Sequence, residues 1–279
     1  LMNAINVSGN AILIYGFHCG TEGVAIPTLV SRFVAAFIII KLLLKDKWSL
    51  HLERTFRFNP DWSMIRKILS VGIPNGLENS MFQLGKVLVL SLVSTFGTYA
   101  IAANAVSNVI TLFSILPGQA ICLAVTTVIA RCVGAGDYEQ AKYYNKKLIL
   151  LTHIGMAITI FIVFITLPFI LKVYYLSEAA SEATRHIIWF HGFCAILIWA
   201  ESFTLPATFR ACGDAKACMI ISTVSMWSFR VGASYILGKN LGLGVFGVWV
   251  AMIIDWAFRS LLFGIRYFSG KWKKHALVS

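Results

Sequence analysis

Charged residues are scarce in this chain of 279 residues. They make up 13% of it, whereas 58% is apolar, and the mean hydropathy is +0.77. Soluble domains are on average about 25% charged and about 45 to 50% apolar. The composition therefore excludes a soluble globular enzyme and indicates an integral membrane protein.

Acidic residues are half as frequent as basic ones: the chain has 12 Asp and Glu and 24 Lys and Arg, which gives a net charge of +12. In a soluble protein such an excess would suggest a nucleic-acid partner. Here the basic residues cluster in the connections between apolar runs, which is the pattern produced by the positive-inside rule. We therefore expect a lipid bilayer around the protein and no nucleic acid.

Several motifs are missing as well. The six cysteines form no C-x-x-C pair, so we expect neither a zinc site nor a disulfide framework. The sequence contains no H-E-x-x-H and no closely spaced pair of aspartates, so a membrane-embedded enzyme and a cofactor are not expected. The chain begins at Leu1, inside an apolar stretch without the basic region and cleavage site of a signal peptide, and we expect it to be a piece of a longer protein.

Long apolar runs dominate what is present. A membrane-spanning helix needs about 20 apolar residues, and barrel strands would instead alternate over about ten. The continuous runs therefore predict an all-α membrane protein with about eight transmembrane helices. The runs are 2–16, 24–44, 74–96, 100–130, 148–171, 187–209, 218–238 and 245–268.

Basic residues alternate between the connections. Residues 41–67 hold seven Lys and Arg, and the connections after the fourth and sixth runs and the C-terminus are also basic, whereas the alternate connections are poor in them. The bias places the 41–67 stretch and the C-terminus in the cytoplasm. The end of this stretch, 59–69, reads as a capped amphipathic helix lying on the membrane before the third run.

A short repeat links the first pair of runs to the last. The sequence GTEGV at 20–24 returns as GVFGV at 244–248, each time between two apolar runs. We interpret the first and second runs as a repeat of the seventh and eighth. Repeats of this kind are typical of transporters.

Ionisable residues inside the runs are the candidates for function, because a charge at mid-bilayer costs at least about 2.5 to 3.5 kcal/mol. They are Arg32, Glu78, Lys86, His153, His191, Glu201, Arg230, Asp255 and Arg259. Glu78 and Lys86 lie two helical turns apart and are candidates for a substrate or cation site; a solvated helix start with a snorkelling lysine is the alternative. Glu201 is a candidate for a proton, sodium or cationic-substrate role, or for a plain interhelical hydrogen bond.

The other ionisable residues have structural interpretations. Asp255 and Arg259 are spaced i, i+4 and can pair on one helix, whereas Arg230 has no partner visible in the sequence. His153 and His191 are either titrating groups or packed, hydrogen-bonded side chains.

Prolines and glycines mark bends and turns. Pro117, Pro168 and Pro206 interrupt three runs, which allows the bending that alternating access needs or is simply the usual membrane-helix composition. The sequences GAGD at 134–137 and GD at 213–214 read as turns in which Asp caps the next helix, with Arg210 nearby as a possible gate residue.

Four stretches resemble the multidrug and toxic compound extrusion (MATE) family. They are 72–79 (GIPNGLEN), the run from AANA at 102–105 through PGQ at 117–119 to GAGD at 134–137, the run from LPATFRACGD at 205–214 to Arg230, and 244–256. They keep their order and cover nearly the whole chain. The resemblance implies two six-helix lobes, of which this chain would hold the last two helices of the first lobe (1–44), a cytoplasmic linker with an amphipathic helix (45–70), the complete second lobe (71–270) and a basic tail (271–279).

The resemblance also implies a function. Such transporters sit in the plasma membrane and export cationic or amphipathic compounds in exchange for inward Na⁺ or H⁺, and a full-length monomer is expected. In some members, acidic residues on the first and fourth helices of the second lobe bind the cation; those helices here carry Glu78 and Glu201. A flippase for lipid-linked sugars is the alternative, which a cavity lined by several arginines would favour.

Overall fold

The computed structural model describes residues 1–44, 60–270 and 272, and these residues are helical apart from short turns. It divides into two compact units, 1–61 and 62–279, which are described separately. All eight apolar runs lie in helices, as predicted. Among the described residues, five helices are long and apolar enough to cross a membrane: α2 (Glu22–Leu43), α4 (Thr98–Gly134), α5 (Tyr138–Val173), α6 (Glu178–Ala211) and α8 (Gly244–Phe268).

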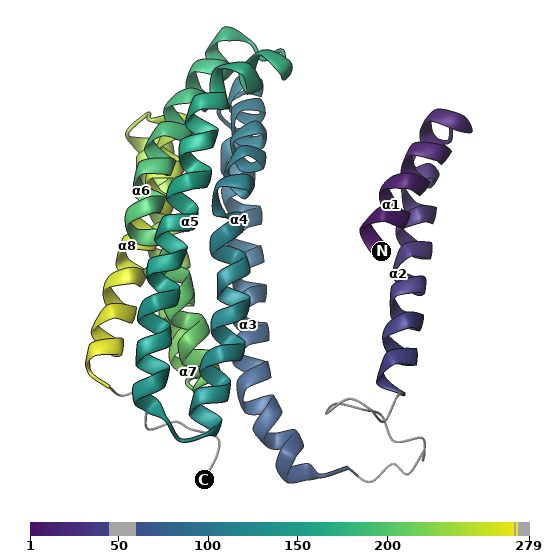
Figure 1. Ribbon diagram of the computed structural model, residues 1–279. Coiled ribbons are helices and arrows are strands. Elements are labelled where there is room, and N and C mark those ends of the chain that lie inside the picture. Colours follow the sequence, from purple (N-terminus) through teal and green to yellow (C-terminus); the bar gives the residue numbers. More distant parts are fainter. Residues whose placement is uncertain (45–59, 271, 273–279) are drawn as a thin grey trace. The chain divides into compact units, whose positions relative to one another are not determined.

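The first unit is a helical hairpin (Figure 1). α1 (Met2–Ala11) continues into a π-helical turn, η1 (Ile12–Gly16), and returns as α2. The helices approach closely where Gly9 meets Pro27, since a Cβ on Gly9 would lie only 2.7 Å from Pro27 Cβ. Arg32 is exposed on α2 within this unit.

The second unit is a bundle of α3 to α8 (Figure 1). Besides α4, α5, α6 and α8 it contains α3 (Trp62–Ser94), α7 (Ala215–Ser225) and two π-helical segments, η2 (Met226–Gly232) and η3 (Tyr235–Asn240). α6 packs against α4, α5 and α8, so its middle forms the core, with Trp199 and Phe209 fully buried. Burying such large aromatic groups is the main source of packing energy in this unit.

The stretch expected as an amphipathic helix, 59–69, is helical from Trp62 onward and continues directly into the third run. Residues 62–94 make one continuous helix, because Pro74 is accommodated inside α3 without ending it. The first turns of α3 extend beyond the bundle at the lower end of Figure 1, and Trp62 and Ile68 on them are largely exposed. The rest of the expected linker, 45–59, and most of the basic tail, 271 and 273–279, lie outside the described residues.

The predicted repeat has a structural counterpart. In both hairpins the first helix ends in a π-helical segment, η1 or η3, followed by a glycine-containing turn and a long helix. The second glycine of each motif packs onto that segment: a Cβ on Gly23 would meet Leu13 and Ile14, and one on Gly247 would lie 2.8 Å from the Leu237 backbone. The second glycine of the GxxG motif is therefore a close-packing position in both hairpins.

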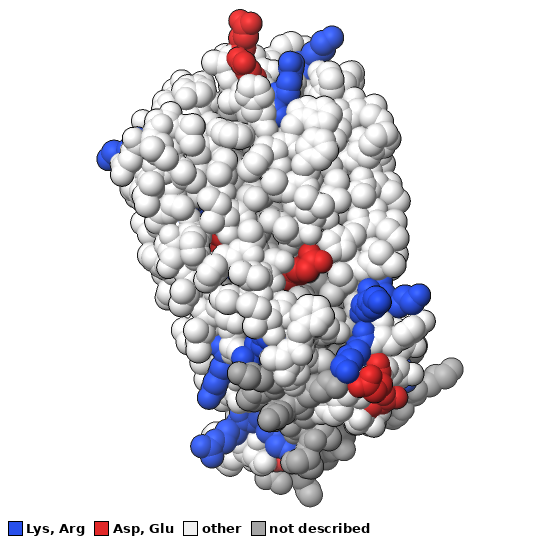
Figure 2. Space-filling view, turned by 90° about the vertical axis from the view of Figure 1, so that its left-hand side faces the viewer, with Lys and Arg blue, Asp and Glu red and all other residues white. Residues whose placement is uncertain are grey.

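Charged side chains gather toward the two ends of the face that Figure 2 presents, and its middle is mostly uncharged. Such a middle fits lipid contact. At the ends, Asp137 caps α5 as predicted, accepting a hydrogen bond from the Gln140 backbone N–H at 2.9 Å. Asp214 stands at the N-cap of α7 but does not cap it; it accepts two hydrogen bonds from Arg266, at 2.6 and 2.9 Å.

Candidate functional site: a basic aromatic cavity

The second unit contains a cavity of ≈ 500 Å³ between α3, α4, α6, η2 and α8. A smaller space of ≈ 240 Å³ adjoins it and shares Lys86, Asn108, Arg230, Trp249 and Met252 in its lining. Much of the wall is aromatic. The aromatic lining residues are Phe82, His191, Trp199, Phe203, Trp249 and Trp256.

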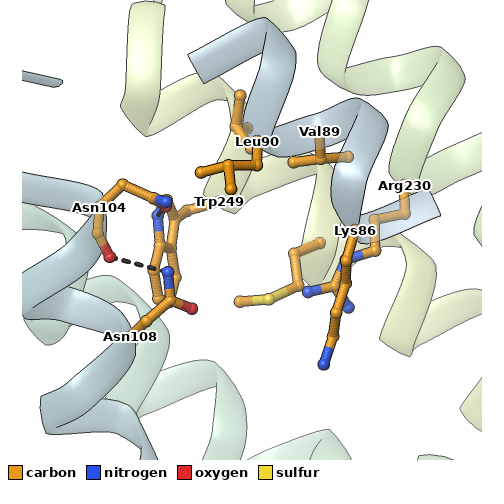
Figure 3. A pocket seen from close by; sticks show the side chains of 9 residues that line it. Lys86, Val89, Leu90, Asn104, Asn108, Arg230 and Trp249 are labelled. Atoms are coloured by element: carbon orange, nitrogen blue, oxygen red, sulfur yellow. Dashed lines mark hydrogen bonds between the residues drawn. The ribbon is translucent and has the colours of Figure 1, made fainter. Parts of the chain in front are cut away.

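Small residues and side-chain hydrogen bonds hold this wall in place. Gly118, directly after Pro117, lets the Trp199 ring lie against the α4 backbone, because a Cβ there would be 2.3 Å from Trp199 Cζ3. Trp199 in turn stacks on Phe203, with ring centroids 4.8 Å apart. Trp249 is oriented by a hydrogen bond of 3.1 Å from its Nε1–H to Asn104 Oδ1 (Figure 3).

Two cations share one aromatic ring at the edge of the cavity. Lys86 Nζ lies 5.0 Å and Arg230 Cζ 5.3 Å from the centroid of Phe82, and both side chains line the cavity. Both also line the adjoining smaller space, which Figure 3 shows. Arg230 comes from the π-helical segment η2, and irregular helix of this type is frequent at functional sites.

The expected pair of Asp255 and Arg259 is not formed. Asp255 is fully buried; Arg230 Nη1 is 3.8 Å from its Oδ2, and the Ser225 hydroxyl donates to its Oδ1. Arg230 therefore has the partner that could not be identified in the sequence.

Arg259 instead donates from Nη2 to the Ser202 carbonyl at 3.4 Å and lies over the Phe203 ring. That carbonyl is free because Pro206, four residues later, lacks the N–H that would bond to it. α6 nevertheless continues through Pro206, and α4 through Pro117, so neither proline ends its helix.

Glu78 does not reach the cavity as an open carboxylate. Its Oε2 lies 3.3 Å from Nη1 of Arg210, which is itself a lining residue. α3 and α6 are thereby joined by an ion pair, and Arg210, expected near a gate, is the cavity-facing member of it.

Glu201 lies on another side of α6. It is two residues from both Trp199 and Phe203, which is about 200° around a helix, and it is absent from the cavity lining. Its Oε1 is 2.9 Å from His153 Nε2 on α5, and His153 Nδ1 is 2.7 Å from the Ile196 carbonyl. The structure thus brings together two residues that the sequence analysis treated separately.

This geometry requires a proton between the two side chains. The Ile196 carbonyl can only accept, so His153 Nδ1 carries a hydrogen. A neutral imidazole would then present a bare Nε2 to the carboxylate, and two acceptors do not form a hydrogen bond. A hydrogen bond between Nε2 and Glu201 therefore needs one more proton, on Nε2 or on the carboxyl group. The other carboxylate oxygen of Glu201, Oε2, is buried without a hydrogen-bond partner among the described residues.

His191 lies in the cavity wall as a packed side chain. It is buried, with its ring 5.5 Å from that of Trp249 and 5.3 Å from that of Trp256. This tryptophan pair and the amides of Asn104 and Asn108 were not among the residues predicted from the sequence. Their spacings gave a signal, because Trp residues seven apart and Asn residues four apart each share one face of a helix.

Within 1–44, 60–270 and 272, no group of three His, Cys, Asp or Glu lies close enough together to hold a metal ion.

The comparisons with known proteins agree on one family. The family model described as MatE matches residues 74–236. A protein described as probable multidrug resistance protein NorM, from Thermotoga maritima, is 27% identical over 284 residues, covering 100% of this chain and 60% of its own length. An uncharacterized transporter, YisQ of Bacillus subtilis, is 26% identical and is likewise covered over 60% of its length. The chain thus spans about 60% of the curated relatives it matches.

Solved structures show the same fold. An outward-facing multidrug resistance transporter of the MATE family superposes with a TM-score of 0.88 at 20% identity, over 98% of this chain and 62% of that one. A Pyrococcus furiosus transporter of the MOP superfamily, described as having a binding pocket of reverse polarity, superposes with a TM-score of 0.86 at 21% identity, over 97% and 61% of the two chains.

Proposed function

Since the chain belongs to the multidrug and toxic compound extrusion (MATE) family, we propose that the complete protein is a secondary active exporter of amphipathic compounds. The observation that carries this proposal is the aromatic cavity of ≈ 500 Å³ in the second unit. Cavities of ≈ 300 to 1,000 Å³ with apolar walls and a few polar groups are typical of small-molecule sites. Arg210 and Arg230 in the lining are the kind of feature expected for the flippase alternative, but the relatives described as multidrug resistance proteins support export.

The expected preference for cationic compounds finds no support in this cavity. Glu78 is paired with Arg210, and Glu201 is outside the lining. The charged residues of the lining are Lys86, Arg210 and Arg230, all basic. We therefore propose amphipathic rather than cationic substrates.

We propose H⁺ rather than Na⁺ as the coupling ion, carried by Glu201 with His153. Within residues 60–270, the hydrogen bonds and ion contacts of these two side chains are with each other and with the Ile196 carbonyl. The pair joins α5 to α6, so loss of its proton removes a link between two helices of the bundle. α6 also forms much of the cavity wall, which gives proton release a physical route to the substrate site.

Transport would proceed by alternating access, in which the lobes rock around a site between them. We place the complete protein in the plasma membrane as a monomer, with its C-terminus in the cytoplasm; the alternation of basic connections supports this orientation.

The test is transport by the complete protein in proteoliposomes. Rhodamine 123 and fluorescein should both be tried, with an imposed pH gradient and, separately, an imposed Na⁺ gradient. We expect dye flux under the pH gradient above that of protein-free liposomes. Flux under the Na⁺ gradient alone would overturn proton coupling, and no flux of either dye under any gradient would overturn the exporter.

A further inference from the structure

We propose that the cavity of the second unit binds the anionic group of an amphipathic organic anion, with Lys86 and Arg230 as the anion-binding pair. This inference rests on the proposed function and names the substrate class that the site selects.

Lys86 and Arg230 are placed as an anion clamp would be. Lys86 Nζ lies 5.0 Å and Arg230 Cζ 5.3 Å from the centroid of Phe82, so two like charges border the cavity near the same ring. Figure 3 shows the two side chains next to each other in the wall of the adjoining smaller space. Among the described residues, Lys86 makes no ion pair or hydrogen bond, and its ammonium group contacts the Phe82 ring instead. Arg230 meets Asp255 only at 3.8 Å, too long for a hydrogen bond.

The nearby carboxylates leave this excess of positive charge in place. Glu78 forms an ion pair with Arg210. The carboxylate of Asp255 faces Arg230 and accepts a hydrogen bond from Ser225. Arg259 lies one helical turn after Asp255 on α8. Lys86, Arg230 and Arg259 thus stand against one carboxylate. Uncompensated cations in a low-dielectric wall are costly, and a bound anion lowers that cost. A cationic ligand would raise it.

The remaining wall suits an apolar, aromatic body. Trp199, Phe203 and Trp249 line the same space that Lys86 and Arg230 border. A small ligand with one aromatic body and one carboxylate or sulfonate would satisfy both parts. An anionic phospholipid shares this chemistry, but the cavity of ≈ 500 Å³ favours a small soluble molecule.

The test uses two dyes with the same xanthene ring and opposite charge, fluorescein and rhodamine 123. Their binding to the complete purified protein in nanodiscs is measured by fluorescence polarisation. We expect tighter binding of fluorescein, and an increase of about tenfold or more in its Kd for Lys86→Gln, since hydrogen bonds to charged groups are worth about 1.5 to 3 kcal/mol. Rhodamine 123 should bind Lys86→Gln no more weakly than the unmodified protein. Lys239→Gln, an exposed lysine on η3 outside the cavity, is the matched control and should leave both constants unchanged.

The outcomes separate the two proposals. Fluorescein binding that depends on Lys86 without transport of either dye would sustain this site and overturn the exporter. Export of rhodamine 123 with fluorescein neither bound nor affected by Lys86→Gln would sustain the exporter and overturn the anion site. Loss of fluorescein binding when phosphatidylcholine nanodiscs are replaced by phosphatidylglycerol ones, at a salt concentration high enough to screen repulsion of the dye by the bilayer surface, would show that lipid fills the cavity, against a small soluble ligand.

Discussion

Replacing Gly118 by alanine should destabilise the second unit, although alanine is the better helix former. The new Cβ would lie 2.3, 2.8 and 2.9 Å from three atoms of the Trp199 ring, where ordinary contacts are 3.4 to 4 Å. Trp199 is 2% exposed and stacked on Phe203, so its ring has little room to move. Overpacking at such a rigid contact lowers the free energy of unfolding by about 3 kcal/mol, whereas the higher helix propensity of alanine raises it by about 1 kcal/mol.

The net loss of about 2 kcal/mol corresponds to a fall in Tm of roughly 4 to 8 °C for a unit of this size. It can be measured by thermal unfolding of the purified protein in detergent. Gly264→Ala, inside α8 with nothing within 4 Å of the new Cβ, is the control and should keep or raise the Tm. Trp199→Phe in the Gly118→Ala background should recover part of the loss. A Gly118→Ala protein that melts at or above the unmodified temperature, or effects of the two substitutions that simply add, would refute the reasoning.

Two further predictions concern the turn between α6 and α7. Asp214→Ala should lower the free energy of unfolding by about 2 to 3 kcal/mol, because it leaves Arg266 without its carboxylate partner; Arg266 is 22% exposed, and its contact with solvent reduces the usual penalty. The control is Glu182→Gln, which changes an exposed carboxylate on α6. Equal Tm values for the two variants would contradict this prediction. Burial, and then the charge of Asp214, raise the pKa of the Cys212 thiol to about 12, so a protein retaining only this cysteine should resist maleimide at pH 7.5 while folded and react once denatured. Stoichiometric labelling of the folded protein would show that the thiol is accessible and ionised.

Most of the architecture could be predicted from the sequence, since apolar length and helical continuity are local properties. The eight runs all form helices, and the GxxG repeat correctly marked two similar hairpins. The helix expected before the third run is the first part of α3, which continues through Pro74, and a boundary of this kind is hard to predict because a proline inside a membrane helix need not end it.

The site was harder to predict because it depends on which side chains face each other across helices. The i, i+4 spacing of Asp255 and Arg259 suggested a pair within α8, but Arg230, from η2, is the residue that meets Asp255. Glu201 lies in α6, one of the helices that could cross a membrane, and Glu78 lies in α3. Their partners, Arg210 and His153, lie on other helices and had no signature in the sequence.

The claim at the centre of this account is that a proton held between His153 and Glu201 couples to export. The most direct measurement is dye flux by the complete protein in proteoliposomes under an imposed pH gradient, comparing Glu201→Gln with Glu182→Gln on the same helix. The account predicts that Glu201→Gln still binds dye but loses the stimulation of flux by the pH gradient, because a glutamine cannot release the proton, and that Glu182→Gln behaves as the unmodified protein. Undiminished stimulation in Glu201→Gln would contradict it.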